Sequence, residues 1–424
     1  MACIGADETK YAFDGGRSES LMAKFTLVCS ACERTHEPSE KAQRCAVCGE
    51  PLLARLDLSE ASWPPSPGRW TARFRSFLPF DSIADELTLG EAGTPLVRAR
   101  SLGKELALRE LWFKCEGANP TGSFKDRGTI TGLLRVRALG LSHVGTVSTG
   151  NMAISVAAYS ARMGLRCLVL AGASVPAEKL APLGLYGANI VRFDGDYGDL
   201  YYSSLRLAKD LPVYMVNSDD PFRIEGQKLL FYEIVDQLGR PPDVVLVPVS
   251  SGGNLSALLK AVDELLDLRV LSKPPLVVGV QASGCNPVAR AFRNGRETVD
   301  RVTHPQTIAH AIMNPYPPSG ARALRALRRV GGLILDVGDE EILAAQRDLA
   351  AKEGIWVQPD SATTLAAIRR LVSDRQVSQG HSVVCVLTGH GFKDAAALGQ
   401  HALPAAATAG HQELPALFER FAWS

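Results

Sequence analysis

A regular alternation of strand-like and helix-like segments most constrains what this chain can fold into. Short runs rich in valine, isoleucine and leucine read as buried strands, and they cover residues 112–116, 144–149, 167–172, 189–193, 212–216, 244–249, 276–281, 333–337 and 383–389. Helical patterns lie between many of these runs, for example at 254–267 and 339–354. Such alternation predicts an α/β fold, in which parallel sheets carry helices on both faces.

Size and composition exclude several classes of protein. The chain has 424 residues, of which 46% are hydrophobic, so we expect two or three domains with sizeable cores. A net charge of +1 gives no reason to expect a nucleic acid or a membrane surface as partner. No apolar run approaches the ~20 residues of a membrane span. The first residues lack the pattern of a secretory signal, so we expect a cytoplasmic protein.

Four of the nine cysteines form a specific pattern near the N-terminus. Cys29 and Cys32 make one CxxC pair, and Cys45 and Cys48 make another after a spacer of twelve residues. This spacing predicts a four-thiolate structural zinc site with no open position for catalysis. Two redox pairs and chance are the alternatives. Nucleic-acid binding by such a ribbon is disfavoured, because the spacer has no basic excess and no interleaved aromatic residues.

The segment 114–128 places one lysine in an unusual setting. Lys125 lies between Phe124 and a charged helix start, and a polar turn at 119–123 precedes it. A lone lysine at such a junction is ordinarily a surface residue. Three further motifs make Lys125 a candidate for a Schiff base with pyridoxal phosphate, because the phosphate, the ring nitrogen and the phenolic oxygen of that cofactor each need a partner.

Two motifs fit the phosphate and the ring nitrogen. A turn between a predicted strand and a predicted helix can bring backbone N–H groups to an anion, and it contains Ser250, Ser251, Gly252, Gly253 and Asn254. Thr388 ends the last predicted strand, where its neutral hydroxyl would leave the pyridine mostly unprotonated. Taken singly, the first motif could be a tight connection and the second a cap of a turn.

A third motif could bind the phenolic oxygen and a substrate carboxylate. Ser148, Thr149 and Asn151 stand at a predicted strand–helix junction, and a helix N-terminus favours a carboxylate. A simple helix cap is the alternative interpretation.

Together these segments resemble the fold-type II pyridoxal-phosphate enzymes, and most closely the threonine synthase family. Segments 119–128, 147–151 and 388–394 are similar to the lysine, carboxylate and ring-nitrogen segments of that family, and 217–228 is similar to a segment that contacts the substrate phosphate. The resemblance runs from the ribbon to about residue 395. It implies two three-layer α/β/α lobes around a cleft, with pyridoxal 5'-phosphate and structural zinc as cofactors and a homodimer as the assembly.

The resemblance also implies roles and boundaries. The implied cofactor-binding residues are Phe124, Lys125, Asn151, Ser250, Ser251, Gly252, Gly253, Asn254 and Thr388, with Lys125 catalytic. The implied substrate-binding residues are Ser148, Thr149, Asn151, Met152, Ser218 and Arg223. The expected division is a flexible segment 1–21, a ribbon 22–54, a large cofactor-binding domain 55–126 and 216–400, a small substrate-binding domain 127–215 and a tail 401–424.

The family converts O-phosphohomoserine and water to threonine and phosphate, so the resemblance implies a lyase acting on a small amino-acid substrate. Four positions depart from the family pattern: Met152, Leu229, Ser251 and Gln358. Met152 and Ser251 fall where the family would reach the leaving phosphate. A β-replacement such as that of cysteate synthase, from O-phosphoserine and sulfite, or a deamination therefore stays open. A non-enzyme that binds a ligand or a partner is the third alternative.

Overall fold

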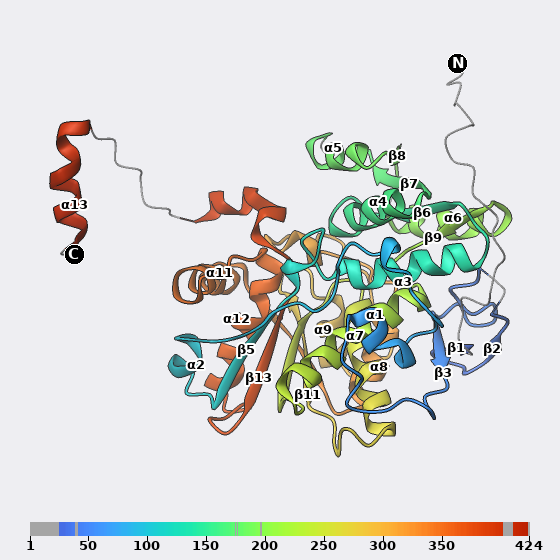
Figure 1. Cartoon of the computed structure of the whole chain (residues 1–424), viewed down its shortest axis with the longest axis horizontal. Coiled ribbons are helices and arrows are strands. Elements are labelled where there is room, and N and C mark those ends of the chain that lie inside the picture. Colours follow the sequence, from blue (N-terminus) through green and yellow to red (C-terminus); the bar gives the residue numbers. More distant parts are fainter. Residues whose placement is uncertain are drawn as a thin grey trace.

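The computed structural model describes residues 25–38, 41–173, 175, 177–195, 197–401 and 410–422. Three sheets organise these residues (Figure 1). The strands of both larger sheets pair in parallel, apart from one edge strand, as the alternation in the sequence predicts. The segment 1–21, expected to be flexible, and part of the tail 401–424 lie outside the described residues.

The larger sheet has six strands in the order β12-β11-β10-β13-β5-β4. Their bounds are β4 (Leu96–Arg98), β5 (Glu110–Cys115), β10 (Val244–Pro248), β11 (Leu276–Ala282), β12 (Leu333–Val337) and β13 (Ser382–Leu387). All neighbours pair in parallel except β4, which runs antiparallel to β5 at the edge. Every residue of β10 and β13 is buried, as expected for central strands covered on both faces.

The smaller sheet has the order β8-β7-β6-β9 and is entirely parallel. Its strands are β6 (His143–Val147), β7 (Arg166–Gly172), β8 (Asn189–Phe193) and β9 (Val213–Met215). The chain completes this sheet between β5 and β10 of the larger one, so the smaller sheet is one continuous insertion. In Figure 1 it occupies the upper part of the molecule.

A third, antiparallel sheet forms the N-terminal ribbon, in the order β2-β1-β3. Its strands are β1 (Phe25–Cys29), β2 (Thr35–His36) and β3 (Leu52–Leu56). Strand β3 packs against the long helix α7 (Pro221–Leu238). The ribbon is therefore joined to the body of the protein and is not a separate module on a linker.

The remaining elements are helical. The other α-helices are α1 (Trp70–Arg73), α2 (Leu102–Glu105), α3 (Lys125–Ala138), α4 (Asn151–Met163), α5 (Ala177–Leu185), α6 (Tyr197–Asp210), α8 (Gly253–Asp267), α9 (Pro287–Arg293), α10 (Gly320–Arg329), α11 (Asp339–Glu353), α12 (Pro359–Ser373) and α13 (Leu414–Ala422). The 3-10 segments are η2 (Arg75–Phe77), η3 (Asp85–Leu87), η4 (Glu116–Ala118), η5 (His310–Ile312), η6 (Gly391–Gln400) and η7 (His411–Glu413). Among the described residues, no helix combines the length and the apolar character that a bilayer span needs.

Helices cover both faces of the larger sheet. Val245 and Val247 of β10 belong to a core that includes residues of α7, α8 and α10. Val244 and Leu246, the alternate residues of the same strand, belong to a second core with α11 and α12. Because successive side chains of a strand point to opposite faces, this division confirms the three-layer arrangement.

The fold class and the predicted strands are confirmed. Each of the nine predicted strand segments overlaps an observed strand, and the two quoted helical patterns correspond to α8 and α11. The antiparallel edge strand β4 was not predicted. One core extends from the ribbon through both sheets, so the boundaries drawn at residues 126 and 215 stay a prediction.

A buried network of charges anchors α3. Arg127 donates from Nε to Glu116 at 2.6 Å and from Nη2 to Glu233 at 2.7 Å, and the Nζ atom of Lys114 lies 2.8 Å from Glu233. All four side chains are almost completely shielded from solvent. Burial alone would raise the pKa of Glu233, but the charges of Arg127 and Lys114 lower it to about 2. The network ties β5 and α7 to the start of α3.

We predict that Glu233→Gln strongly destabilises the protein. The substitution keeps the shape but leaves Lys114 and Arg127 with less compensation for their buried charges, which typically costs about 3–5 kcal/mol. Urea unfolding should report this loss. The pKa of Glu233 is depressed, so its stabilisation is complete above the unfolded-state pKa of about 4.3 and is lost as the pH falls toward about 2.

An exposed ion pair supplies the control. Asp300→Asn breaks the contact with Arg296, where both side chains are more than half exposed, and should cost less than about 1 kcal/mol. Equal unfolding midpoints for the two variants would show that the buried network does not anchor α3.

Candidate active site

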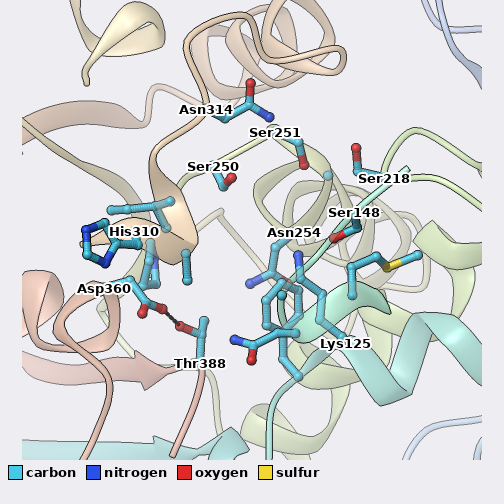
Figure 2. A pocket seen from close by; sticks show the side chains of 18 of the residues that line it. Lys125, Ser148, Ser218, Ser250, Ser251, Asn254, His310, Asn314, Asp360 and Thr388 are labelled. Carbon is cyan, nitrogen blue, oxygen red and sulfur yellow. Dashed lines mark hydrogen bonds between the residues drawn. The ribbon is translucent and has the colours of Figure 1, made fainter. Parts of the chain in front are cut away.

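A cavity of about 920 Å³ lies where the two parallel sheets meet. Its lining includes the residues that follow the carboxyl ends of β6, β10 and β13 (Figure 2). The chain runs from β10 outward to β11 and β12, whereas β13 returns to the other side of β10. The junction of β10 and β13 is therefore a topological switch point, where open α/β sheets bind their ligands.

The structure brings all the candidate cofactor and substrate residues to this cavity. They are Phe124, Lys125, Ser148, Thr149, Asn151, Met152, Ser218, Arg223, Ser250, Ser251, Gly252, Gly253, Asn254 and Thr388. They come from both sheets and from widely separated parts of the sequence. Their placement agrees with the expected site, while their individual roles stay predictions.

Lys125 begins α3 and points into the cavity (Figure 2). Its Nζ atom lies 4.4 Å from the centre of the Phe124 ring. Burial, together with the charge of Arg223 and against that of Asp360, lowers the pKa of Lys125 to about 7. A large fraction of this amine is therefore neutral and nucleophilic near neutral pH, unlike an ordinary surface lysine.

The glycine-rich turn between β10 and α8 fits an anion. Gly252 has a positive φ of 88°, and a Cβ atom at this position would lie 2.7 Å from the carbonyl oxygen of Ser319. A Cβ atom on Gly253 would lie 2.6 Å from the carbonyl oxygen of Ser218. Glycine is therefore required at both positions, and it leaves the first N–H groups of α8 open to a ligand. The buried Nδ2 of Asn254 has no hydrogen-bond acceptor among the described residues.

Thr388 follows β13 and faces the cavity from the large sheet. Its hydroxyl donates to Oδ2 of Asp360 at 2.9 Å, the contact drawn in Figure 2, and lies 3.1 Å from Oγ of Ser361. Burial raises the pKa of Asp360 to about 6. The sequence pointed to Thr388 but missed Asp360, because an acidic residue directly after Pro359 resembles an ordinary helix start.

The opposite side of the cavity is formed by the turn from β6 to α4. Ser148 and Thr149 line it, and Asn151 is the first residue of α4. The Nδ2 of Asn151 donates to Oε1 of Gln358 at 2.7 Å. Gln358 directly precedes α12, which packs against the large sheet, whereas α4 follows a strand of the small sheet. This hydrogen bond therefore joins the two sides of the cavity.

Arg223 supplies a buried positive charge. It lies in the first turn of α7, which Asp220 caps by accepting from the backbone N–H groups of Phe222 and Arg223. One guanidinium nitrogen lies 3.3 Å from the carbonyl oxygen of Asn217, but Nε and Nη2 have no partner among the described residues. Burial lowers the pKa of Arg223 to about 10. A buried cation with two open donors favours an anionic ligand.

Several residues that line the cavity were not singled out as site residues from the sequence. His310 and Asn314 approach from the segment around η5, and Lys393 and Asp394 from η6. His310 lies 3.6 Å from Asp394. These residues belong to segments without a regular period, so only their resemblance to family segments could have suggested them.

The four cysteines come together as the spacing predicts. The Sγ atoms of Cys29, Cys32, Cys45 and Cys48 all lie within 4.8 Å of one another. Three of these sulfur–sulfur distances are 3.3, 3.6 and 3.7 Å. Tetrahedral zinc with Zn–S bonds of about 2.3 Å requires sulfur atoms about 3.8 Å apart, so the cluster is compatible with zinc.

The ribbon contacts the loop that carries Ser218. Arg44 donates to Oδ2 of Asp219 at 2.8 Å and to the carbonyl oxygen of Pro318 at 2.7 Å. The neighbouring Gln43 donates to the carbonyl oxygen of Met215. Because Arg44 directly precedes Cys45 and Asp219 directly follows Ser218, this contact links the four-cysteine cluster to one wall of the cavity.

Comparisons with known proteins agree with this geometry. Residues 87–389 match the family model described as pyridoxal-phosphate dependent enzyme. A threonine synthase of Methanocaldococcus jannaschii is 40% identical over 86% of this chain and 92% of its own length. A threonine synthase of Mycobacterium bovis is 40% identical over 79% and 91%, respectively. The solved structure of a threonine deaminase from T.th. is 28% identical, covers 70% of this chain and 92% of its own, and has a TM-score of 0.58.

We predict that Cys45→Ser abolishes the binding of one zinc ion per chain. Three thiolates cannot complete a structural tetrahedral site, and folding energy supplied by the metal is lost with it. The melting temperature should fall by roughly 5 °C or more, a larger relative effect than the loss in turnover. Metal analysis and thermal denaturation of purified protein test this prediction.

Cys115→Ser serves as the control, since Cys115 is a free thiol outside the cluster. It should keep the metal. Unchanged metal content and melting temperature in Cys45→Ser would refute the zinc assignment.

Proposed function

This chain belongs to the pyridoxal-phosphate-dependent enzymes and, within them, to the threonine synthase family, and we propose that it converts O-phosphohomoserine and water to threonine and phosphate. The observation that most supports this substrate is the buried Arg223, a positive charge close enough to Lys125 to lower its pKa and suited to a substrate phosphate.

Three features of the cavity suit the cofactor. Lys125 offers a nucleophilic amine, the turn 250–254 offers N–H groups to the phosphate, and Thr388 offers a hydroxyl to the ring nitrogen. Nδ2 of Asn254, which has no acceptor among the residues that the structure describes, supports an anion at the turn. When bound, pyridoxal phosphate supplies an electron sink that stabilises negative charge at the substrate carbon beside the amine.

Lys125 also serves as the base of the reaction. With its pKa near 7, the Nζ atom can take a proton from a substrate carbon and return it to a neighbouring one. The charge of Arg223 helps to keep the amine neutral, because two positive charges so close together are unfavourable. The same residue pair thus prepares the base and attracts the anionic substrate.

Arg223 and Ser218 are the proposed ligands of the substrate phosphate. Nε and Nη2 of Arg223 are buried donors without acceptors among the described residues, and a phosphate oxygen would satisfy them. Ser218 lies on the adjoining loop, whose backbone touches the glycine-rich turn.

The turn 148–151 is the proposed site of the substrate carboxylate. It lies at the N-terminus of α4, where the helix dipole and open N–H groups favour an anion. We further propose that residues 127–215 form the substrate-binding domain. The hydrogen bond from Asn151 to Gln358 then joins the two domains across the cleft.

Elimination or replacement at O-phosphoserine, as in cysteate formation, is the second candidate. Met152 favours it, because this apolar side chain lines the cavity where the family resemblance implies a small hydroxyl residue. A shorter phosphorylated substrate would place its phosphate differently with respect to this side chain.

We predict that Lys125 carries the cofactor covalently. Borohydride reduction of the cofactor-loaded protein should add the cofactor mass to the peptide that contains Lys125. Lys125→Ala should show no such adduct, because it has no amine at this position. Lys393→Ala removes another lysine of the same cavity and should leave the adduct in place. An adduct on any other lysine of the wild type would contradict the assignment.

We predict that Arg223→Ala lowers kcat/KM for the phosphorylated substrate by about 10- to 100-fold, the effect of losing hydrogen bonds worth about 1.5–3 kcal/mol to a charged group. The affinity for pyridoxal phosphate should change only a few-fold. Phosphate release and product mass, with O-phosphohomoserine and O-phosphoserine tested separately with and without sulfite, provide the measurement.

The outcomes separate the candidates. Threonine formed from O-phosphohomoserine supports the proposal, and cysteate formed only with O-phosphoserine and sulfite supports the second candidate. Equal losses of cofactor affinity and turnover in Arg223→Ala would make this residue structural.

A further inference from the structure

We propose that Asp360 is a positioning residue that acts through Thr388 to keep the pyridine nitrogen of the cofactor protonated. The inference rests on the proposed placement of Thr388 at that nitrogen and does not depend on which amino acid is the substrate. It reverses the expectation that a neutral hydroxyl leaves the ring nitrogen without a proton.

Asp360 and Thr388 form a buried pair. Asp360 is the second residue of α12 and is 3% exposed, and Thr388 directly follows β13 and is 4% exposed. The hydroxyl of Thr388 lies 2.9 Å from Oδ2 of Asp360. Both residues also line the cavity, and their side chains face each other across the hydrogen bond drawn in Figure 2.

The hydroxyl of Ser361 restricts the hydrogen bonds that Thr388 can make. Oγ of Ser361 lies 3.1 Å from the Thr388 hydroxyl and accepts from the backbone N–H of Gly389 at 3.0 Å. The Ser361 proton can therefore be donated to Thr388, since its other acceptor, the carbonyl oxygen of Gly389, is more distant at 3.4 Å. The Thr388 hydroxyl, which has one proton and two lone pairs, then needs an acceptor for its single proton.

The protonation state of Asp360 determines how the hydroxyl of Thr388 is oriented. While Asp360 is ionised it can only accept, so the hydroxyl of Thr388 donates to it and presents a lone pair to the cavity. A ring nitrogen facing that lone pair makes a hydrogen bond only if the nitrogen itself carries a proton. Once Asp360 is protonated it donates to Thr388, and the Thr388 proton turns toward an unprotonated nitrogen. The two states differ in the place of one proton, which is on Asp360 or on the ring nitrogen, while Thr388 keeps its own.

The surrounding charges decide which state prevails. Burial raises the pKa of Asp360 and Asp394 of η6 adds to the rise, whereas the hydrogen bond from Thr388 and the charge of Lys125 of α3 oppose it, so that the pKa is about 6. His310 of η5, which packs against α12, also lies in this cavity beside Asp394. Above about pH 6 the ionised carboxylate is the main form, and its negative charge together with the lone pair of Thr388 favours a proton on the ring nitrogen. A protonated ring withdraws electrons more strongly, so Asp360 strengthens the sink that the cofactor supplies.

Nitrogen-15 NMR of the protein with bound cofactor measures the protonation state of the ring nitrogen directly. Apoprotein reconstituted with pyridoxal phosphate labelled at the ring nitrogen should show, at about pH 8, the chemical shift of a protonated pyridine in the wild type. Asp360→Asn should show the shift of an unprotonated pyridine, because the neutral amide can donate to Thr388 and turn the Thr388 proton toward the ring.

Ser361→Ala is the matched control. It removes the other hydrogen-bond partner of Thr388 but keeps the carboxylate, so its ring nitrogen should remain protonated. The readout needs no substrate and no turnover, so its result is independent of the identity of the substrate.

Three results would overturn the proposal. An unprotonated nitrogen in the wild type at about pH 8 does so without any variant, even if Asp360→Asn fails to fold or to load. A protonated nitrogen in Asp360→Asn shows that another group supplies the proton. An unprotonated nitrogen in Ser361→Ala shows that the hydroxyl arrangement, and not the carboxylate, sets the state.

Discussion

The fixed start of helix α3 is the constraint on which the active site depends. Three consecutive residues at this helix start make three different kinds of contact. Lys125 points into the cavity, Asp126 accepts from Thr121 and from Ser155 of α4, and Arg127 enters the buried network with Glu233. The reactive amine is thereby tied to the large sheet through Arg127 and to the small sheet through Asp126, so its position is set before any ligand binds.

Electrostatics around the cavity follow from the same arrangement. Lys125 and Arg223 place two basic groups close together in a buried space, and burial lowers the pKa of both. Nε and Nη2 of Arg223 have no acceptor within the described part of the chain, and Asp360 and Asp394 provide the acidic side of the cavity. Such groups suit a cofactor that carries a phosphate, and the family match is to enzymes that depend on pyridoxal phosphate.

Sequence periodicity was sufficient for the sheets, because buried parallel strands such as β10 and β13 need continuous apolar runs. Local motifs located Lys125, the glycine-rich turn and Thr388, since each needs a specific residue at a turn. Asp360 could not be found this way, because its role depends on a contact with a residue 28 positions away. The link from Arg44 to Asp219 depends equally on tertiary packing. The edge strand β4 is too short for a period to be recognised.

The central claim is that the fold holds the amine of Lys125 in a neutral, reactive form. Competitive acetylation of the ligand-free protein with trace reagent, followed peptide by peptide by mass spectrometry over a range of pH, measures the pKa of this single amine. The account predicts a midpoint near 7, whereas Lys352, whose pKa is raised by its contact with Glu105, should titrate as a much weaker acid. A midpoint for Lys125 near the ordinary lysine value of about 10.4 would contradict it.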